Sequence, residues 1–415
     1  MNCARQQEPA FLADRVNAYV ERSKNPISGG HFVKGRIPAN DDIQLVSNDY
    51  LSISSHPEIA KANIESLRAY GHGHVNSAVF QKGDTPQRQF EIKAADWLST
   101  EDSMLSQSGW CANAGLVQSL ATPEVPVYLD MMAHMSLWEG VKSAGAKPRP
   151  FRHNNSKSLE NLVKKYGQGV ILVDSLYSTS GSICPLKEVA NISSRYGCIL
   201  VVDESHSLGV MGKQGAGLVD ELGLADQVQF RTASLSKAFA ARGGIIAGTA
   251  RHIEYLRYES FPAIFSSAVL DHESAGFLAA LEVIKKENNR RDDLNNNADF
   301  LRGQLRRLGY DVSESQSQIM SLVAGPEHQT IVLRDALEAR GVFGSPFCAP
   351  ATPKNRSLIR FSVNSGLTKE QLTRVVEVCR EIKDIVQREN WPVAARVKQY
   401  QPAPRRRQPE LSLAF

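Results

Sequence analysis

The sequence contains no apolar run near the roughly 20 residues that a membrane-spanning helix needs, so no membrane span is expected. It contains no CxxC pair either: six cysteines are scattered along the chain, which favours free thiols over disulfides, and no metal site is predicted. A large excess of positive charge is also absent. The formal net charge of +4 does not favour nucleic-acid binding. Because residues 1–16 lack an apolar core, no secretory signal is expected, and we predict a cytoplasmic protein.

Short apolar runs alternate with helical patterns between about residues 100 and 250. Nearly continuous apolar strands separated by helices predict an α/β fold, with a mostly parallel sheet covered on both faces. Several runs end in polar motifs, namely SQSG, DMMAH, DSLYS, DESH and SLSK. Since ligands of open α/β sheets bind beyond the carboxyl ends of the strands, we expect these ends to converge on one site. The runs are 104–107, 125–130, 169–174, 198–203, 230–235 and 244–248.

The pattern changes after about residue 285. A charged helical segment ends at Gly309 and is followed by the apolar runs IMSLVAG and LIRFSVN, with helical segments between and after them. This order predicts a smaller α+β domain, and the Pro- and Arg-rich end of the chain predicts a mobile tail. We therefore predict four parts: an N-terminal segment 1–55, a large domain 56–285, a small C-terminal domain 286–395, and a mobile basic tail 396–415.

Two strand ends carry a lysine and an aspartate that could act together. Lys237 lies in SLSK, before small residues typical of a packed turn, although a surface lysine after a strand would give the same pattern. Asp203 lies in VVDESHSLG, 34 positions earlier. A buried carboxylate needs a partner, so Asp203 either caps the next helix or holds a proton on the ring nitrogen of pyridoxal 5′-phosphate (PLP). The Schiff-base lysine of PLP should then lie on a later strand, as Lys237 does.

Two further motifs suit the same cofactor. SQSGWCANAGL predicts a strand, a turn and a helix whose free N–H groups at Gly109, Trp110 and Cys111 could bind the phosphate. Alone this motif is weak, because strand-to-helix turns often contain glycine. His134, in DMMAHMSLWEG, follows the next strand. A lone histidine is more often structural, but here it could also lie flat on the cofactor ring.

Taken together, the motifs resemble the α-oxoamine synthase family. The resemblance extends from about residue 40 to 390, with the motifs in the family order. It implies PLP-dependent transferases of fold type I, which act as homodimers and condense an amino acid with an acyl-CoA, usually with loss of CO2. The matching stretches are SNDYL (47–51), SGWCAN (108–113), HMS (134–136), DESHSLG (203–209), SLSK (234–237) and IRFSVN (359–364).

The resemblance implies a role for each matching residue. Lys237 would form the Schiff base and act as the base, Asp203 would contact the pyridine nitrogen, and His134 would stack on the ring; these are the expected catalytic residues. Arg360 would bind the amino-acid carboxylate, and Asn48 would lie beside the substrate. The other expected cofactor-binding residues are Ser108, Gly109, Trp110, Ser178, His206, Ser234 and, from the neighbouring subunit of a shared active site, Ser266 and Ser267.

One stretch departs from the family pattern. Family enzymes that make heme, biotin or sphingolipid precursors carry a GSGGSR-like loop after a YG, where this chain has YGHGHVNSAVFQKGD (70–84). The departure, with HMSLWEG and PAIFSS, favours the branch that makes aminoketone precursors of α-hydroxyketone quorum-sensing autoinducers. That branch implies a medium-chain acyl-CoA and either 2-aminobutyrate or S-adenosylmethionine. The alternatives are a synthase of the 8-amino-7-oxononanoate, 2-amino-3-ketobutyrate, 5-aminolevulinate or serine palmitoyltransferase type, and an inactive partner subunit, which typically lacks the lysine.

Overall fold

A computed structural model describes residues 8–24, 31, 33–349, 351–353 and 355–388. The predicted mobile tail, the last residues of the predicted small domain and Cys3 lie outside these ranges. The other five cysteines are free thiols, at positions 111, 184, 198, 348 and 379. No helix in the described ranges combines the length and apolarity that crossing a bilayer requires. Within the same ranges, no group of His, Cys, Asp and Glu side chains is arranged to hold a metal ion.

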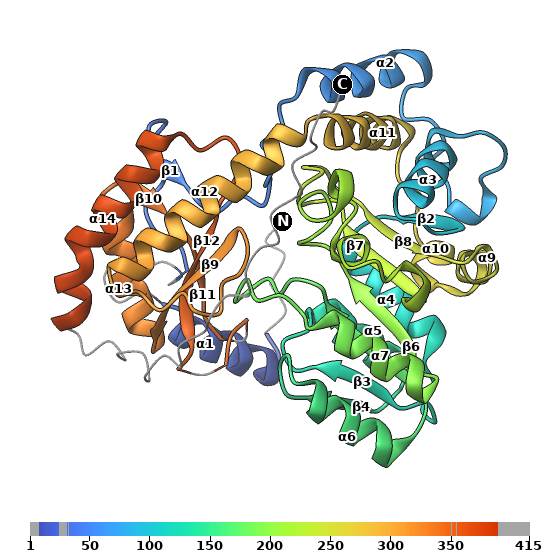
Figure 1. Ribbon diagram of the computed structural model, residues 1–415, viewed down its shortest axis with the longest axis horizontal. Coiled ribbons are helices and arrows are strands. Elements are labelled where there is room, and N and C mark those ends of the chain that lie inside the picture. Colours follow the sequence, from blue (N-terminus) through green and yellow to red (C-terminus); the bar gives the residue numbers. More distant parts are fainter. Residues whose placement is uncertain (1–7, 25–30, 32, 350, 354, 389–415) are drawn as a thin grey trace, which may run out of the picture.

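A seven-stranded sheet forms the centre of the larger part of the molecule (Figure 1). Neighbouring strands are parallel, except that β8 is antiparallel to both β2 and β7, so the predicted mostly parallel sheet is confirmed. The spatial order is β2 (Asp102–Ser106), β8 (Gly244–Gly248), β7 (Phe230–Ser234), β6 (Ile199–Asp203), β5 (Val170–Asp174), β3 (Val127–Asp130) and β4 (Pro148–Phe151). The sequence did not predict β4. Its PRPF stretch contains two prolines, which a sheet tolerates at an edge.

Side chains along the central strands alternate between two hydrophobic clusters. On β6, Val201 packs in a cluster with α4 (Gly109–Leu120) and α5 (Met135–Ser143). Its neighbours Leu200 and Val202 pack on the opposite face, with α6 (Ser156–Tyr166) and α7 (Leu186–Tyr196). Because successive side chains of a strand point to opposite faces, a run that is apolar at every position is buried on both sides.

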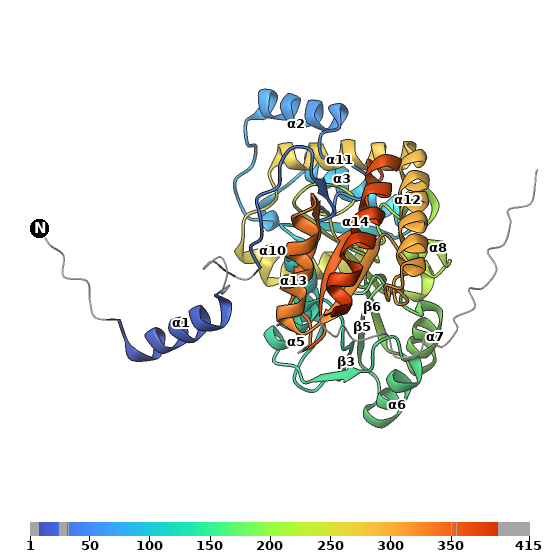
Figure 2. The ribbon, with the colours of Figure 1, turned by 90° about the vertical axis from the view of Figure 1, so that its left-hand side faces the viewer.

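Several further elements cover the sheet. Helices α3 and α9 contact β2, α11 packs against α2 and α3, and Leu218 of α8 packs in the cluster with α6 and α7. The elements are α2 (Pro57–Tyr70), η1 (Ala78–Phe80), α3 (Pro86–Trp97), η2 (Lys213–Gly215), α8 (Leu218–Glu221), η3 (Ala225–Gln227), α9 (Ala250–Glu259), α10 (Phe261–Phe265) and α11 (Asp271–Lys286). Helix α1 (Ala10–Ser23) projects from the body of the molecule (Figure 2).

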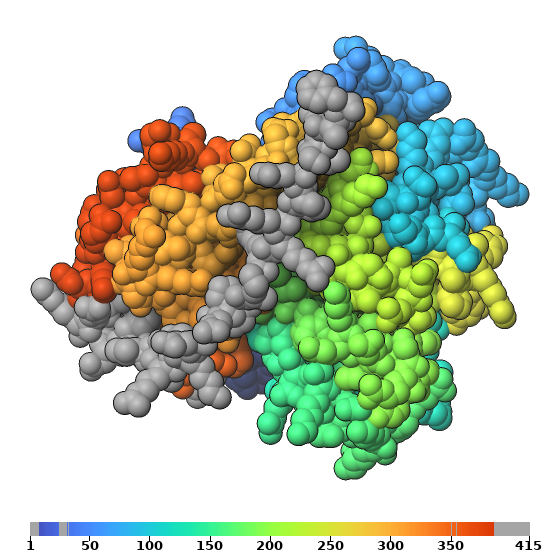
Figure 3. Space-filling model, viewed as in Figure 1, coloured from blue at the N-terminus to red at the C-terminus, as the bar shows by residue number. Residues whose placement is uncertain are grey.

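The smaller part holds a three-stranded antiparallel sheet. Figure 3 shows its helices, orange to red, as a lobe beside the green and cyan surface of the larger part. Short strand β1 (Ile43–Gln44) pairs in parallel with β10 (Val342–Phe343), which ties the N-terminal segment to this lobe. The sheet order is β11 (Ser345–Phe347), β12 (Ser357–Ser362) and β9 (Ile319–Gly325), and the helices are α12 (Asn288–Arg307), α13 (Glu327–Glu338) and α14 (Lys369–Arg388). The four-part division of the chain stays a prediction.

Candidate active site

The end of β7 and the start of α4 approach each other closely at the carboxyl edge of the large sheet. A Cβ added to Gly109 would lie 2.5 Å from Cβ of Ser234, so the approach requires glycine. The Ser108 hydroxyl accepts a hydrogen bond from the N–H of Cys111 at 3.1 Å and caps the helix. The cap occupies the N–H of Cys111, which was predicted to be free, so the N–H groups of Gly109 and Trp110 are the ones that lie beside Ser234, a favourable place for a phosphate.

Lys237 follows β7 by three residues. Its ammonium donates a hydrogen bond to the Ser236 hydroxyl at 3.4 Å. Burial lowers the pKa of Lys237, and the positive charge of Arg360 lowers it further, while Asp203 acts in the opposite direction. An amine with a lowered pKa is more readily available as the free base, which both covalent capture of an aldehyde and proton abstraction require.

Asp203 ends β6 and is only 4% exposed. Its Oδ1 accepts hydrogen bonds from the backbone N–H and the hydroxyl of Ser205, at 2.9 and 2.6 Å. Its Oδ2 accepts one from the side-chain amide of Asn113, at 2.6 Å. Asp174 is its neighbour on β5, and burial, together with the charge of Asp203, raises the pKa of Asp174 well above its usual range. Protonation of Asp174 removes the repulsion between the two carboxyl groups.

His134 precedes α5 and caps it. Its backbone N–H donates to Oδ1 of Asp174 at 3.1 Å, and its Nδ1 lies 2.7 Å from the Ser136 hydroxyl. The ring of Trp110 packs edge-on, with ring centroids 6.1 Å apart. Burial lowers the pKa of His134, so the ring is held neutral and can lie against an aromatic cofactor without adding a charge.

His206 is paired with Tyr50, a residue to which the sequence analysis assigned no role. The Tyr50 hydroxyl lies 2.6 Å from Nδ1 of His206, and Nε2 of Gln318 donates to the His206 carbonyl at 3.0 Å. Burial, with the charges of Lys237 and Arg360, lowers the pKa of His206 well below its usual value. Burial also raises the pKa of Tyr50. With both groups neutral, Tyr50 can donate to Nδ1, which leaves Nε2–H of His206 as a donor.

Arg360 reaches from β12 to two other predicted residues. Its guanidinium donates to the carbonyl of Ser178 and to Oδ1 of Asn48, each at 3.1 Å, and lies 4.7 Å over the Phe347 ring. Its Nε is buried without a hydrogen-bond partner. Among the described residues, no carboxylate forms an ion pair with Arg360. Its buried positive charge is therefore left for an anionic ligand. A carboxylate fits its planar fork of donors.

Ser266 and Ser267 are exposed where α10 ends, as Trp110 and His134 are in their own segments. The carbonyl of Ser267 accepts a hydrogen bond from Nε2 of Gln107 at 2.7 Å, next to the cap residue Ser108. Their contact with a neighbouring subunit stays a prediction. The remaining predicted residues of the candidate site are brought together around the carboxyl ends of β6 and β7.

These groups fit the chemical parts of PLP. The amine of Lys237 suits the aldehyde, and the carboxylate of Asp203 suits a protonated ring nitrogen. The close packing of Gly109 against Ser234 places helix N–H groups and a hydroxyl where a phosphate could be held. The donor set therefore matches the cofactor at three separate points.

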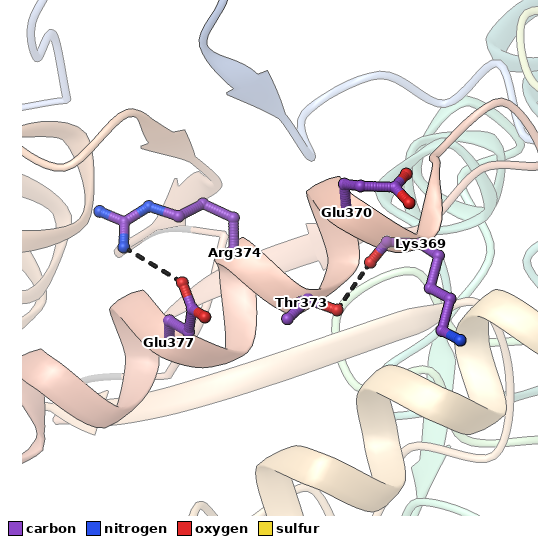
Figure 4. A pocket seen from close by; sticks show the side chains of 5 residues that line it. All are labelled: Lys369, Glu370, Thr373, Arg374 and Glu377. Carbon is purple, nitrogen blue, oxygen red and sulfur yellow. Dashed lines mark hydrogen bonds and ion pairs between the residues drawn. The ribbon is translucent and has the colours of Figure 1, made fainter.

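Two surface hollows lie elsewhere. One, of 380 Å³, is lined by residues of α14, where Arg374 and Glu377 pair at 3.5 Å and the Thr373 hydroxyl donates to the Lys369 carbonyl (Figure 4). The other, of 330 Å³, lies between η1, α3 and α9, and its buried Glu91 is paired with Arg257. Neither hollow is lined by a predicted site residue.

Five residues that received no role from the sequence stand in motifs that also carry a predicted residue. Each contacts a side chain of the site: Tyr50, Asn113, Ser136, Ser205 and Ser236. Only Asn113 had a usable signal. It lies four positions after Gly109, so both share one face of α4.

The fold and the site define a PLP-dependent enzyme of fold type I. The chain belongs to the aminotransferase class I and II family, whose model matches residues 40–378, and within it to the α-oxoamine synthases. The predicted family, fold class and PLP cofactor are therefore confirmed.

Three comparisons with known proteins support this assignment. The chain is 42% identical over 377 residues to the CAI-1 autoinducer synthase of Vibrio campbellii, covering 90% of this chain and 95% of that protein. It is 31% identical to the 8-amino-7-oxononanoate synthase 1 of Bacillus velezensis, covering 81% and 87%. The serine palmitoyltransferase of S. paucimobilis, solved with PLP and myriocin, shares its fold with a TM-score of 0.81 at 24% identity, covering 91% and 97%.

Proposed function

We propose that this chain is an acyl-CoA:amino-acid C-acyltransferase that makes a long-chain aminoketone precursor of an α-hydroxyketone autoinducer. The observation that carries the proposal is the 42% identity to the CAI-1 autoinducer synthase over most of both chains. The substrates are a medium-chain acyl-CoA and either 2-aminobutyrate or S-adenosylmethionine. An inactive partner subunit is disfavoured, because Lys237, Asp203 and His134 are all present and lie in one site.

Each residue of the site has a distinct task in this reaction. When bound, PLP supplies an electron-withdrawing ring that stabilises negative charge on the α-carbon of an amino acid. Lys237 would hold the cofactor through its amine and, once released, would take the α-proton as a general base. Asp203 would keep a proton on the ring nitrogen, and Arg360 would bind the substrate carboxylate. His206, oriented by Tyr50, would donate its Nε2–H to the phenolic oxygen.

The bond changes in the substrates balance with the uptake of one proton from solvent. The deprotonated α-carbon bonds to the thioester carbonyl carbon, the C–S bond breaks, and CoA leaves as its thiol. The carboxylate that Arg360 held is then lost as CO2. Lys237 would return the proton it took to the α-carbon, and a proton from solvent would complete the CoA thiol.

Apolar surface near His134 supports a long acyl donor. Trp110, Met131 and Met135 are exposed on the segments that flank the histidine. Covering them with an alkyl chain would gain about 0.8 kcal/mol for each buried CH2. A short or dicarboxylic acyl group would gain little from the same side chains.

A matrix of substrates tests the proposal. kcat/KM is measured for acyl-CoAs from acetyl to dodecanoyl, each with 2-aminobutyrate, S-adenosylmethionine, glycine, alanine and serine. We expect a rise of roughly tenfold for each two-carbon unit and a peak at about eight carbons or longer, with one of the first two donors. A peak at acetyl-, succinyl- or pimeloyl-CoA with glycine or alanine would instead assign the chain to a synthase of primary metabolism.

The same proposal includes a homodimer with shared active sites. Ser266 and Ser267 follow α10, which packs against η1 and α9. Exposed aromatic side chains gather on these three elements: Phe80, Tyr255, Tyr258, Phe261 and Phe265. An exposed apolar patch of this kind marks an interaction surface. A second copy of the chain on this surface would bring the two serines to the phosphate of the partner's site.

A further inference from the structure

One buried amide group links Asp203 to His134. Asn113 lies on α4 and is 2% exposed. Its Nδ2 is 2.6 Å from Oδ2 of Asp203 and 2.9 Å from the Ser136 hydroxyl. The Ser136 hydroxyl in turn is 2.7 Å from Nδ1 of His134. Asn113 therefore contacts the carboxylate on one side and, through one serine, the imidazole on the other.

Hydrogen-bond chemistry sets the orientation of the Asn113 amide. A carboxylate can only accept, so the group of Asn113 that faces Asp203 is its NH2. The Asn113 carbonyl oxygen lies 2.6 Å from the Thr232 hydroxyl, which donates to it. A flipped amide would place an oxygen against Oδ2 of Asp203 and would lose the bond from Thr232.

The same orientation fixes the proton on His134. The second amide hydrogen of Asn113 is donated to the Ser136 oxygen, so the Ser136 O–H is directed at Nδ1 of His134. The backbone N–H of Ser136 also donates to Nδ1, at 3.3 Å. A nitrogen that accepts two hydrogen bonds carries no proton, so His134 is held as the Nε2–H tautomer. The lowered pKa of His134, caused by burial, agrees with this neutral ring.

We propose that Asn113 is a positioning residue that sets both the orientation of the Asp203 carboxylate and the tautomer of His134. The inference rests on the proposed roles of these two residues at the ring nitrogen and on the ring face of PLP. Because one amide makes both contacts, its loss is expected to disturb Asp203 at the ring nitrogen and His134 on the ring face together. Hydrogen-bond partners of metal-ligating side chains typically change affinity by about 10–100-fold, and we expect an effect of similar size here.

The contact from Asn113 through Ser136 to His134 is tested by NMR on the full-length protein, with and without PLP. Side-chain ¹⁵N shifts of His134, assigned by their loss in His134→Gln, report its tautomer. In wild type we expect Nε2–H. Ser136→Ala loses the hydroxyl at 2.7 Å and keeps only the longer backbone N–H contact at 3.3 Å, so we expect a shift of population toward Nδ1–H. Ser193→Ala is the control, since Ser193 is also a buried serine and donates to the Cys198 carbonyl at 2.7 Å, away from Asn113 and His134. A His134 tautomer unchanged in Ser136→Ala would overturn the proposal.

The contact between Asn113 and the Asp203 carboxylate is tested by PLP binding. Asn113→Ala should raise the dissociation constant of PLP by at least about tenfold and change the pH dependence of its visible absorption band. Asn297→Ala, which removes two hydrogen bonds from Asn297 to backbone carbonyls in the small lobe, should change neither. If Asn113→Ala does not fold, Thr232→Val takes its place. It keeps the Asn113 amide but removes the hydroxyl that donates to it, so the amide can flip. The PLP dissociation constant and the pH dependence of the absorption band should then change in the same directions, but less.

Wild-type affinity and an unchanged band in a folded Asn113→Ala protein would overturn the proposal. If only Thr232→Val can be measured, wild-type affinity and an unchanged band in that variant would overturn it as well. None of these measurements uses turnover or an acyl-CoA. Failure of the proposed acyltransferase activity would therefore leave them unaffected, and the two proposals can fail separately.

Discussion

At the scale of single residues, the chemistry of the site depends on charges that lack an ordinary partner. Lys237 is half-buried near Arg360, and its partial desolvation and the charge of Arg360 both lower the pKa of its amine. Arg360 itself keeps a buried Nε without a hydrogen-bond partner. Such arrangements reduce the stability of a folded chain, so they are typical of sites that bind and react with a ligand. The lysine can then release its proton near neutral pH more readily than an exposed lysine does.

Lys237→Ala should keep PLP bound noncovalently and lose turnover. We expect kcat/KM to fall by at least about 10³-fold, roughly 4 kcal/mol, because the variant loses both the covalent attachment and the general base. Steady-state kinetics measure the loss. Borohydride reduction followed by mass spectrometry should label wild type at Lys237 and leave the variant unlabelled. The exposed Lys187 on α7 gives a control variant, Lys187→Ala. Near-wild-type turnover by Lys237→Ala would show that another group is the base.

The pH dependence of PLP capture should respond to Arg360. Its positive charge lowers the pKa of Lys237, so Arg360→Gln should raise that pKa. The free amine then forms only at higher pH, and the midpoint of the capture rate against pH should move upward. Stopped-flow absorbance on the PLP-free protein measures the midpoint. Arg374→Gln on the exposed surface of α14 is the control. A midpoint that stays or moves downward would contradict the placement of Arg360 beside Lys237.

At the scale of elements, the site depends on how closely a helix start can approach two strands. The first turn of α4 lies against the end of β7 at Gly109 and against β8, where a Cβ on Gly244 would lie 2.2 Å from the Ser108 carbonyl oxygen. Larger side chains at either glycine would move the helix away from the strands. The N–H groups that are proposed to bind the phosphate would move with it.

Gly109→Ala should therefore destabilise the protein and weaken PLP binding together. The added methyl would meet Ser234, and overpacking of this kind costs about 1–3 kcal/mol. Denaturant unfolding and PLP titration measure the two effects. Gly303→Ala is a matched control, because a Cβ there has nothing within 4 Å and the residue lies inside α12. That variant should be more stable by up to about 1 kcal/mol. Equal stability of the two variants would argue against tight packing at Gly109.

At the scale of the whole molecule, one chain leaves part of the proposed site exposed. Ser266 and Ser267 lie at the surface, next to the aromatic patch on η1, α9 and α10. In a symmetric dimer the same patch on both copies would form the interface. Each active site would then need residues from two chains.

Mixing two inactive variants tests this arrangement. A Lys237→Ala chain keeps its serines, and a Ser266→Ala/Ser267→Ala chain keeps its lysine. If the serines act on the partner's site, random re-association of the two chains restores one complete site in half of the dimers, and activity returns to about a quarter of wild type. If the serines act within their own chain, no complete site forms. Activity that does not recover after verified exchange of subunits would rule out the shared site.

The order of amino acids was enough to predict the class of the fold and the chemical centre of the candidate site. Apolar runs with polar ends predicted the central strands, and IMSLVAG is β9 with the same bounds. Lys237 and Asp203 could be proposed because a buried charge at a strand end is unusual whatever packs around it. These features are local, and local periodicity and burial can be recognised directly in the order of residues.

Which side chains meet could be seen only in the folded chain. Arg360 contacts Asn48 across 312 positions of the chain, and Asn113 contacts Asp203 across 90. Edge strand β4 was not predicted, because pairing with β3 rather than its own composition makes it a strand. The physical reason is the same in each case: a hydrogen bond between distant residues depends on how helices and strands pack, and packing follows from the whole chain at once.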